Sequence, residues 1–365
     1  MRREEMGGCA NIKFPLTPRL WMAFVGLLVC APPVELKAQF AFATNNGALT
    51  ITNYTGSGGT VVIPASTNGY PVTAFSFPSF ANQTTITNVI IPGSITNMGW
   101  SAFYECTGLK SVTIDDGVTN IGEGAFYYCT QLASVAIPNS VTSISNFAFG
   151  YCYDLTNVTI PDSVTNIDDL AFYYCDGLRN LVIPNSVTSI GAEAFYTCYG
   201  LTNVTFSDSL ISIGSSAFSG CTGLKNVTIP NSVTDIESNA FEFCEQLTNM
   251  TIPASVTNLG RLAFFSCPKL TNVYFQGNAP SVDGTPGSTD TSVFTNETGT
   301  VYYVPGTTGW GSTFGGWPTA PLYQMQLQTL ASGQGFGEPK TPFKFSISWG
   351  TNASAVVLAS TNLLN

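Results

Sequence analysis

The fold of this chain is decided by one phrase that returns along it. Residues Leu155–Cys175 read LTNVTIPDSVTNIDDLAFYYC, and residues Leu247–Cys267 read LTNMTIPASVTNLGRLAFFSC. The cysteine that ends the phrase recurs at an unbroken interval of 23 residues. It stands at Cys106, Cys129, Cys152, Cys175, Cys198, Cys221, Cys244 and Cys267. A fixed period of this length is the signature of a repeat architecture, so the repeat is interpreted before any single motif.

Apolar residues keep their phase in each unit, counted here from the cysteine as position 1. Position 4 is Leu, position 7 is mostly Val and position 9 is Ile or Phe, which predicts a short strand that the proline at position 10 closes in most units. Val at 13 and Ile at 16 predict a second extended piece. Ala-Phe at 20 and 21 suits one turn of α- or 3₁₀-helix before the next cysteine.

A single unit has too few apolar side chains to offset the conformational entropy of ordering it, so successive units must stack into a solenoid. The pattern LxxVxIPxxVxxIxxxAFxxC resembles the BspA-type bacterial leucine-rich repeat over residues 83–278, with a looser unit around 61–64. The resemblance implies a β-rich leucine-rich-repeat solenoid, with short parallel strands and short helical or 3₁₀ turns, capped at both ends. It also implies an exported or surface protein with a role in adhesion or protein binding.

The chain divides into five predicted segments. Residues 1–38 are a signal peptide, 39–82 an N-terminal cap with a divergent first repeat, and 83–278 the solenoid. Residues 279–322 are a C-terminal cap, because a solenoid needs its end cores covered. Residues 323–365 are a linker and a partial β-hairpin module with a turn near 350–352. This hairpin either pairs with the solenoid end or belongs to a longer C-terminal module.

The N-terminus is typical of an export signal. Basic residues precede an apolar run, Leu20–Cys30, that is too short to span a bilayer, and Pro32 and Pro33 break it. Cleavage after Ala38 is expected. An uncleaved membrane anchor and a lipidated cysteine are the alternatives. The expected location is therefore secreted or on the cell surface, with no membrane insertion after signal removal.

Composition excludes several classes of function. Only 9% of residues are charged, about a third of the usual share, and the formal net charge is −10. This balance argues against nucleic-acid partners and anionic lipid surfaces. The chain contains no histidine, which removes Ser-His-Asp and Cys-His nucleophiles and His-ligated zinc. No catalytic residue, cofactor or metal site is predicted.

The cysteine column has three interpretations. Free cysteine packs as a small buried hydrophobe, which is the favoured one. Disulfides between neighbouring units are within reach, but stacked side chains point in parallel and suit bridging poorly. A metal site needs clustered ligands, whereas these cysteines form a single line.

Two exposed rows are candidate ligand-binding surfaces. The first is polar and lies at positions 6 and 8 of the first strand, with Asn157, Thr159, Asn203 and Thr205. The second is aromatic and lies at positions 22, 23 and 2. Its candidate ligand-binding residues are Tyr127, Tyr128, Tyr151, Tyr173, Tyr174 and Tyr196, and Tyr104, Tyr153 and Tyr199 belong to the same row. Tyrosine supplies large contact area at low entropy cost. The alternative is that these rings only cover the core.

The sequence thus predicts a secreted, non-enzymatic solenoid that binds a protein or a glycan. One rival is a carboxylate-based glycosidase, although the adjacent pairs Asp115–Asp116 and Asp168–Asp169 point to opposite sides of an extended chain. The other is an ice-binding protein, for which the row Ser163/Thr165, Ser186/Thr188 and Ser232/Thr234 is the feature to examine. Ile211 interrupts that row.

Overall fold

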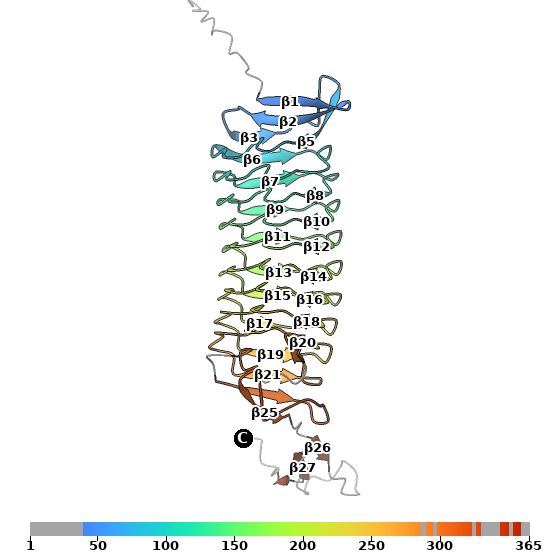
Figure 1. The fold of residues 1–365 in the computed structure, drawn as a ribbon, viewed down its shortest axis with the longest axis vertical. Helices are drawn as coiled ribbons and strands as arrows, with labels where there is room; N and C mark the ends of the chain where they lie inside the picture. Colours follow the sequence, from blue (N-terminus) through green and yellow to red (C-terminus); the bar gives the residue numbers. More distant parts are fainter. Residues whose placement is uncertain are drawn as a thin grey trace, which may run out of the picture. The chain divides into compact units, whose positions relative to one another are not determined.

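A computed structural model describes residues 39–285, 290–294 and 298–322, together with three strand backbones at 326–329, 344–349 and 353–358. The signal peptide predicted for residues 1–38 lies outside the described residues. None of the described residues lies in a helix, and none belongs to a helix long and apolar enough to cross a membrane. The predicted solenoid is confirmed: parallel strands recur once per repeat and stack in register (Figure 1).

The first side of each coil is the strand predicted around positions 6 to 9. Its strands pair in parallel one coil apart, for example Val112 with Val135 and Val135 with Val158. They form three consecutive ladders, β3-β6-β7-β9-β11, β13-β15-β17 and β19-β21-β23-β25. Their bounds are β3 Gly59–Val62, β6 Ile86–Ile91, β7 Ser111–Ile114, β9 Ser134–Ala136, β11 Asn157–Thr159, β13 Asn180–Val182, β15 Asn203–Thr205, β17 Asn226–Val227, β19 Asn249–Ile252, β21 Asn272–Phe275, β23 Thr300–Tyr303 and β25 Trp317–Pro321.

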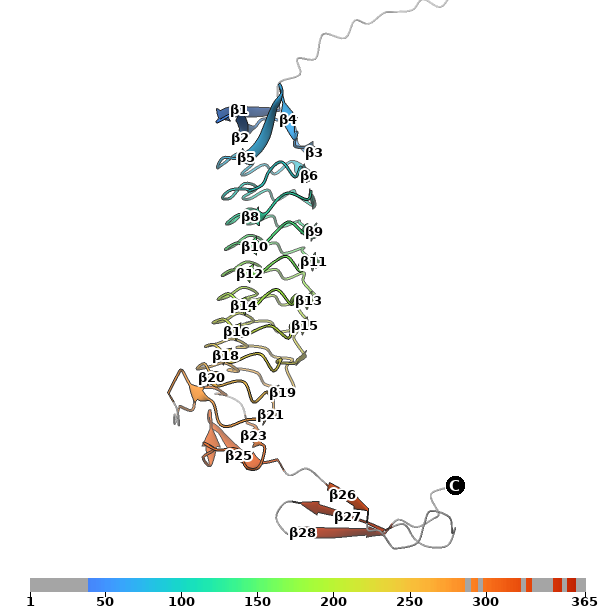
Figure 2. The same ribbon diagram turned by 90° about the vertical axis from the view of Figure 1, so that its right-hand side faces the viewer.

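The second side is the extended piece predicted around position 16. It forms one continuous eight-stranded parallel sheet, and in Figure 2 strands β8 to β20 follow the edge of the stack opposite β9 to β19. The strands are β8 Asn120–Ile121, β10 Ser143–Ile144, β12 Asn166–Ile167, β14 Ser189–Ile190, β16 Ser212–Ile213, β18 Asp235–Ile236, β20 Asn258–Leu259 and β22 Ser281–Val282. The inward residue of each strand enters the core, and it is isoleucine in all but the last two strands, where it is Leu259 and Val282.

The third side, positions 19 to 23, is called the turn side, and here the prediction of a helical turn is wrong. The backbone makes separate turns, such as Tyr127 N–H to Gly124 O at 3.0 Å and Cys129 N–H to Phe126 O at 3.1 Å. Residues at positions 19 and 23 adopt a left-handed φ, 59° at Gly124 and 62° at Tyr128, which stops each turn from continuing as a helix.

Hydrogen bonds to the next coil hold the turn side in this conformation. The N–H groups of Phe103, Phe126 and Phe149 donate to the alanine carbonyls of the following coil, each at 2.8 Å. Tyr128 N–H donates in the same way to Gly150 O at 2.8 Å. Backbone groups that a helix would have satisfied internally are therefore satisfied between coils.

The core is continuous from one cap to the other. A phenylalanine at position 21 stacks on its counterpart in the next coil, with centroids 5.4 Å apart for Phe103–Phe126 and 5.2 Å for Phe172–Phe195. Beside this column the eight repeat cysteines are free and buried, as predicted. Each thiol donates to a carbonyl, for example Cys152 Sγ to Phe126 O at 3.3 Å.

Aromatic side chains close both ends of the stack. At the N-terminal end, β1 (Phe40–Asn45) and β2 (Ala48–Tyr54) pair antiparallel, and Tyr54 stacks on Phe80, the first ring of the column, at 5.5 Å. At the C-terminal end, Trp317 stacks on Phe294 at 4.4 Å. The remaining cap strands are β4 Ser66–Thr67, β5 Tyr70–Phe75 and β24 Thr313–Phe314.

The tail forms a separate sheet of three strands. The predicted hairpin is present as β27 (Lys344–Trp349) antiparallel to β28 (Ala353–Leu358). A further strand that was not predicted, β26 (Gln326–Thr329), pairs antiparallel with β27.

Candidate binding surface

The turn side projects its side chains at positions 22 and 23 away from the core. Position 21 is the buried phenylalanine, and the left-handed residue at position 23 redirects the chain before the cysteine turns inward again. The six predicted tyrosines all lie here and are half-buried. They form one cluster with Tyr104, Tyr153 and Tyr199, and the cluster is called the tyrosine face.

Stacking between coils orders the tyrosine face. Tyr128, Tyr151 and Tyr174 form one stack at position 23, with centroids 4.5 Å and 5.1 Å apart. At position 22, Tyr173 stacks on Tyr196 at 5.2 Å. Edge contacts join the two columns, as between Tyr173 and Tyr174 at 4.7 Å. Such aromatic pairs stabilise one another beyond the area that they bury.

One glycine interrupts the position 22 column. Gly150 stands between Tyr127 and Tyr173, and a Cβ added to it would lie 3.0 Å from the Tyr127 ring. The ring of Phe147 fills part of this space and meets the Tyr127 ring edge-on, with the two ring centroids 5.5 Å apart. The aromatic surface therefore continues past the gap.

Two hydroxyls of the tyrosine face, those of Tyr127 and Tyr151, have a pKa above the ordinary tyrosine value. Burial raises the pKa of Tyr127 to about 12, and the neighbouring Tyr151 and Tyr128 act in the same direction. Burial is also the largest cause of the raised pKa of Tyr151. Tyr127 and Tyr151 therefore offer neutral hydroxyls that can both donate and accept hydrogen bonds.

The polar row lies elsewhere. Asn157, Thr159, Asn203 and Thr205 are exposed on the first side, as predicted. Asn203 Nδ2 donates to Asn180 Oδ1 of the preceding coil at 3.0 Å. Among the described residues, no ring contact or hydrogen bond joins this row to the tyrosine face, so the two candidate surfaces do not form one site.

Sequence reasoning missed an aromatic pair beside the tyrosine face. Phe77 and Trp100 are 51% and 56% exposed, and their rings lie 4.6 Å apart. A cavity of about 150 Å³ lies next to Trp100, walled by Tyr104, Tyr127 and Phe147 and completed by small or polar residues. It is called the Trp100 recess. The signal was present, because Phe77 and Trp100 are separated by one 23-residue period.

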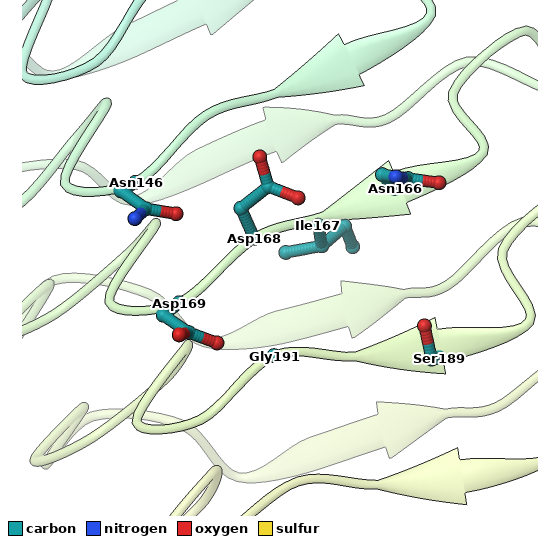
Figure 3. Close-up of a pocket in the computed structure, with 7 residues that line it drawn as sticks. All are labelled: Asn146, Asn166, Ile167, Asp168, Asp169, Ser189 and Gly191. Carbon is teal, nitrogen blue, oxygen red and sulfur yellow. The ribbon is translucent and has the colours of Figure 1, made fainter.

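A second cavity, of about 250 Å³, contains the acidic pair Asp168–Asp169. Figure 3 shows the two carboxylates leaving the chain in different directions. Asp169 Oδ1 accepts a hydrogen bond from Ala192 N–H at 2.7 Å, and burial is the largest cause of the raised pKa of Asp168. Asp169 is thus bound to the backbone of the next coil, and the described residues contain no group of three His, Cys, Asp or Glu side chains that could hold a metal.

The serine–threonine row is exposed only in part. Thr165 Oγ1 donates to Thr142 O of the preceding coil at 3.2 Å, whereas Ser163 Oγ donates to Val141 O at 2.7 Å and is partly buried. Ile211, 50% exposed, interrupts the threonines. The exposed surface is therefore a single broken row of threonines.

One solved structure supports the fold, and two others are similar in sequence. A leucine-rich repeat protein from Bacteroides ovatus is 24% identical, with a TM-score of 0.53 over 73% of this chain and 70% of that one. A leucine-rich cell surface protein from Faecalibacterium prausnitzii is 29% identical over 67% of this chain and 95% of that one, with a TM-score of 0.32. A leucine-rich repeat protein from T. pallidum is 28% identical over 57% and 88%, with a TM-score of 0.46. No curated protein matches the chain.

The family comparison covers most of the solenoid. The model of the BspA type leucine rich repeat region matches residues 63–179 and 165–285, with six copies. These two overlapping stretches include the buried phenylalanine and cysteine columns and the whole tyrosine face. The chain therefore belongs to the BspA-type leucine-rich repeat family.

Proposed function

We propose that this chain is exported and acts as a non-catalytic binding protein, and that its tyrosine face contacts a protein or glycan on an extracellular surface. The observation that carries the proposal is the face itself. Six tyrosines from four successive coils are stacked on neighbouring tyrosines, half-buried and held on a backbone that is hydrogen-bonded from coil to coil. Pre-ordered aromatic rings bind with little loss of conformational entropy.

The leader-like N-terminal sequence supports export. The charge distribution supports a partner that is neither nucleic acid nor an anionic membrane. The cavity at Asp168 does not favour a glycosidase, because the backbone of Ala192 holds one of its two carboxylates. No specific observation favours a second function over binding.

The test is a retention screen of the protein on arrays of glycans and extracellular matrix proteins. The variant carries Tyr127→Ser, Tyr151→Ser and Tyr174→Ser together. Serine already occupies position 22 as Ser219 and position 23 as Ser266, the latter with the same left-handed φ of 56°. We expect the ligands retained by the wild type to lose about tenfold or more in affinity, because aromatic anchors dominate such interfaces.

The matched control carries Asn157→Ser, Thr159→Ser and Asn203→Ser on the first side. It should bind like the wild type, and both variants should keep the wild-type circular dichroism spectrum. Loss of binding in the control with full retention in the tyrosine variant would move the site to the polar row and refute the proposal.

A further inference from the structure

The Trp100 recess lies at the N-terminal end of the tyrosine face, where one coil lacks a side chain at position 19. Position 19 carries a large side chain in later coils, Phe147 and Leu170, but glycine at residue 124. A Cβ at Gly124 would lie 3.0 Å from Ser101 Oγ and 3.7 Å from Tyr127 Cβ. The missing side chain leaves a hollow between Trp100 on one side and Tyr104 and Tyr127 on the other.

The size of the recess limits its occupant. Its volume of about 150 Å³ is well below the roughly 300 Å³ at which pockets for whole small molecules begin. The opening therefore suits the end of one side chain supplied by a larger partner.

The walls of the recess are flat aromatic rings. Tyr104 and Tyr127 stack with an interplanar angle of 8°, Phe147 meets Tyr127 edge-on, and Trp100 is backed by Phe77. The indole of Trp100 remains 56% exposed beside Phe77. Aromatic faces attract cations, and tryptophan does so most strongly.

The part of the chain that forms the N-terminal cap and the early coils is strongly negative. Residues 39–178 contain nine Asp and Glu residues and a single cationic residue, Lys110, which leaves a formal charge of −8. Glu123 lines the recess, and Glu105 directly follows Tyr104, another of its lining residues. In the described part of the chain, the ion pairs join Arg261 to Asp283 and Asp290, so neither glutamate is neutralised there by a Lys or Arg.

Aromatic walls, a rim carboxylate and a negative surround together favour a planar cation. An arginine guanidinium can stack on an aromatic face and bind a carboxylate with two parallel hydrogen bonds, which an ammonium cannot do. An anionic sugar or a phosphate would meet the repulsion of the nearby carboxylates.

We propose that the Trp100 recess receives an arginine side chain from a basic segment of a partner protein, with the guanidinium on Trp100 and Glu123 as its counter-ion. The proposal rests on the proposed function of the tyrosine face and specifies the partner: a protein whose contacting segment is basic. The acidic N-terminal coils attract that segment, and the recess fixes one of its arginines.

The test measures the affinity of the full chain for a fluorescein-labelled peptide of alternating arginine and glycine. The same peptide with citrulline in place of arginine keeps the shape and removes the charge. We expect the arginine peptide to bind about tenfold tighter than the citrulline peptide, and Glu123→Gln and Trp100→Ser each to weaken it several-fold. Glu242→Gln, on a late coil, is the matched control and should leave the affinity unchanged.

Equal binding of the two peptides, or no effect of Glu123→Gln, would overturn the proposal. A neutral oligosaccharide that needs Trp100 but not Glu123 would overturn it in favour of carbohydrate, while leaving the tyrosine face as a binding surface. The two proposals can also fail separately. If the arginine peptide needs Glu123 and Trp100, the proposed arginine site in the recess is supported. If the array ligands then bind the triple tyrosine variant as well as the wild type, the proposed function of the tyrosine face is refuted.

Discussion

The early coils that carry the tyrosine face and the late coils after Ser219 have the same interior and different exteriors. Phe149–Phe172 stack at 5.2 Å in the early coils, and Phe241–Phe264 stack at 5.6 Å in the late ones. At position 23, however, the tyrosine stack gives way to Gly220, Phe243 and Ser266. The backbone keeps its left-handed φ throughout, 56° at both Tyr174 and Phe243.

This difference teaches that the inward positions specify the fold and leave the turn side free to vary. Tyrosine, phenylalanine, serine and glycine all occupy position 23 without changing the coil, because hydrogen bonds between coils hold the backbone there. A concentration of tyrosines in successive early coils is therefore not required by folding. We attribute this concentration of tyrosines to the proposed binding of a ligand by the tyrosine face.

The largest expected effect on folding stability comes from removing a buried phenylalanine ring from an early coil. Phe172 is fully buried and stacks on both neighbours, so Phe172→Ala should lower the free energy of unfolding by about 3–5 kcal/mol. Tyr173→Ala, one residue further on, removes a half-buried ring and should cost about 1 kcal/mol. Urea unfolding followed by circular dichroism measures both.

The same core substitution in a late coil is the control for that pair. Phe241→Ala should match Phe172→Ala within about 1 kcal/mol, because both rings are fully buried in the same column. A much smaller loss in either coil would show that the interiors are not equivalent.

A smaller loss of folding stability is expected at high pH in both the early and the late coils. Burial raises the pKa of Cys106 and of Cys221 to about 12, from an ordinary value of 9.0. The unfolded chain therefore loses these protons first, so stability is kept below pH 9 and should fall as the pH rises toward 12.

Thermal unfolding at several pH values measures how steeply the folding stability falls as the pH rises. Cys221→Ala should lessen the alkaline loss of stability, and a variant with an unchanged slope would contradict burial as its cause. Cys106→Ala, from an early coil, should behave in the same way as Cys221→Ala.

The smallest effect on folding stability is expected at the boundary between the early and the late coils. Thr197 occupies position 23 with φ of 59°, a conformation that β-branched residues rarely adopt. Thr197→Tyr should relieve this strain and extend the stack from Tyr174, which would raise the free energy of unfolding by up to about 1 kcal/mol. A clear loss of stability in urea would show that the tyrosine stack cannot be lengthened.

Periodicity predicted both strands of the coil, the buried cysteines and the shared flank of the tyrosines, because each depends on which residues point inward. The left-handed turns could not be predicted in this way. Their positions hold residues such as Glu105 and Tyr128, which carry no glycine signal, and the bonds that stabilise them come from the next coil. One turn of α- or 3₁₀-helix is the expectation from the local sequence, and contacts between coils override it.

The Trp100 recess escaped prediction for a related reason. Phe77 precedes the first counted repeat, and the position shared by Phe77 and Trp100 holds Glu123, Asn146 and Asp169 in later coils. The aromatic pair itself is the one signal at this position, and it does not continue into the counted repeats. A hollow made by one missing side chain at Gly124 appears only when neighbouring coils are placed against each other.

Alkylation of the eight repeat cysteines in the native protein, read cysteine by cysteine with peptide mass spectrometry, tests most directly whether the inward positions form one continuous core. All eight thiols are buried, and burial raises the pKa of Cys106, so a thiol-reactive reagent at neutral pH should leave them unmodified until denaturant is added. Rapid modification of most of them in the folded protein would contradict the stacked architecture and, with it, the free turn side on which the tyrosine face depends.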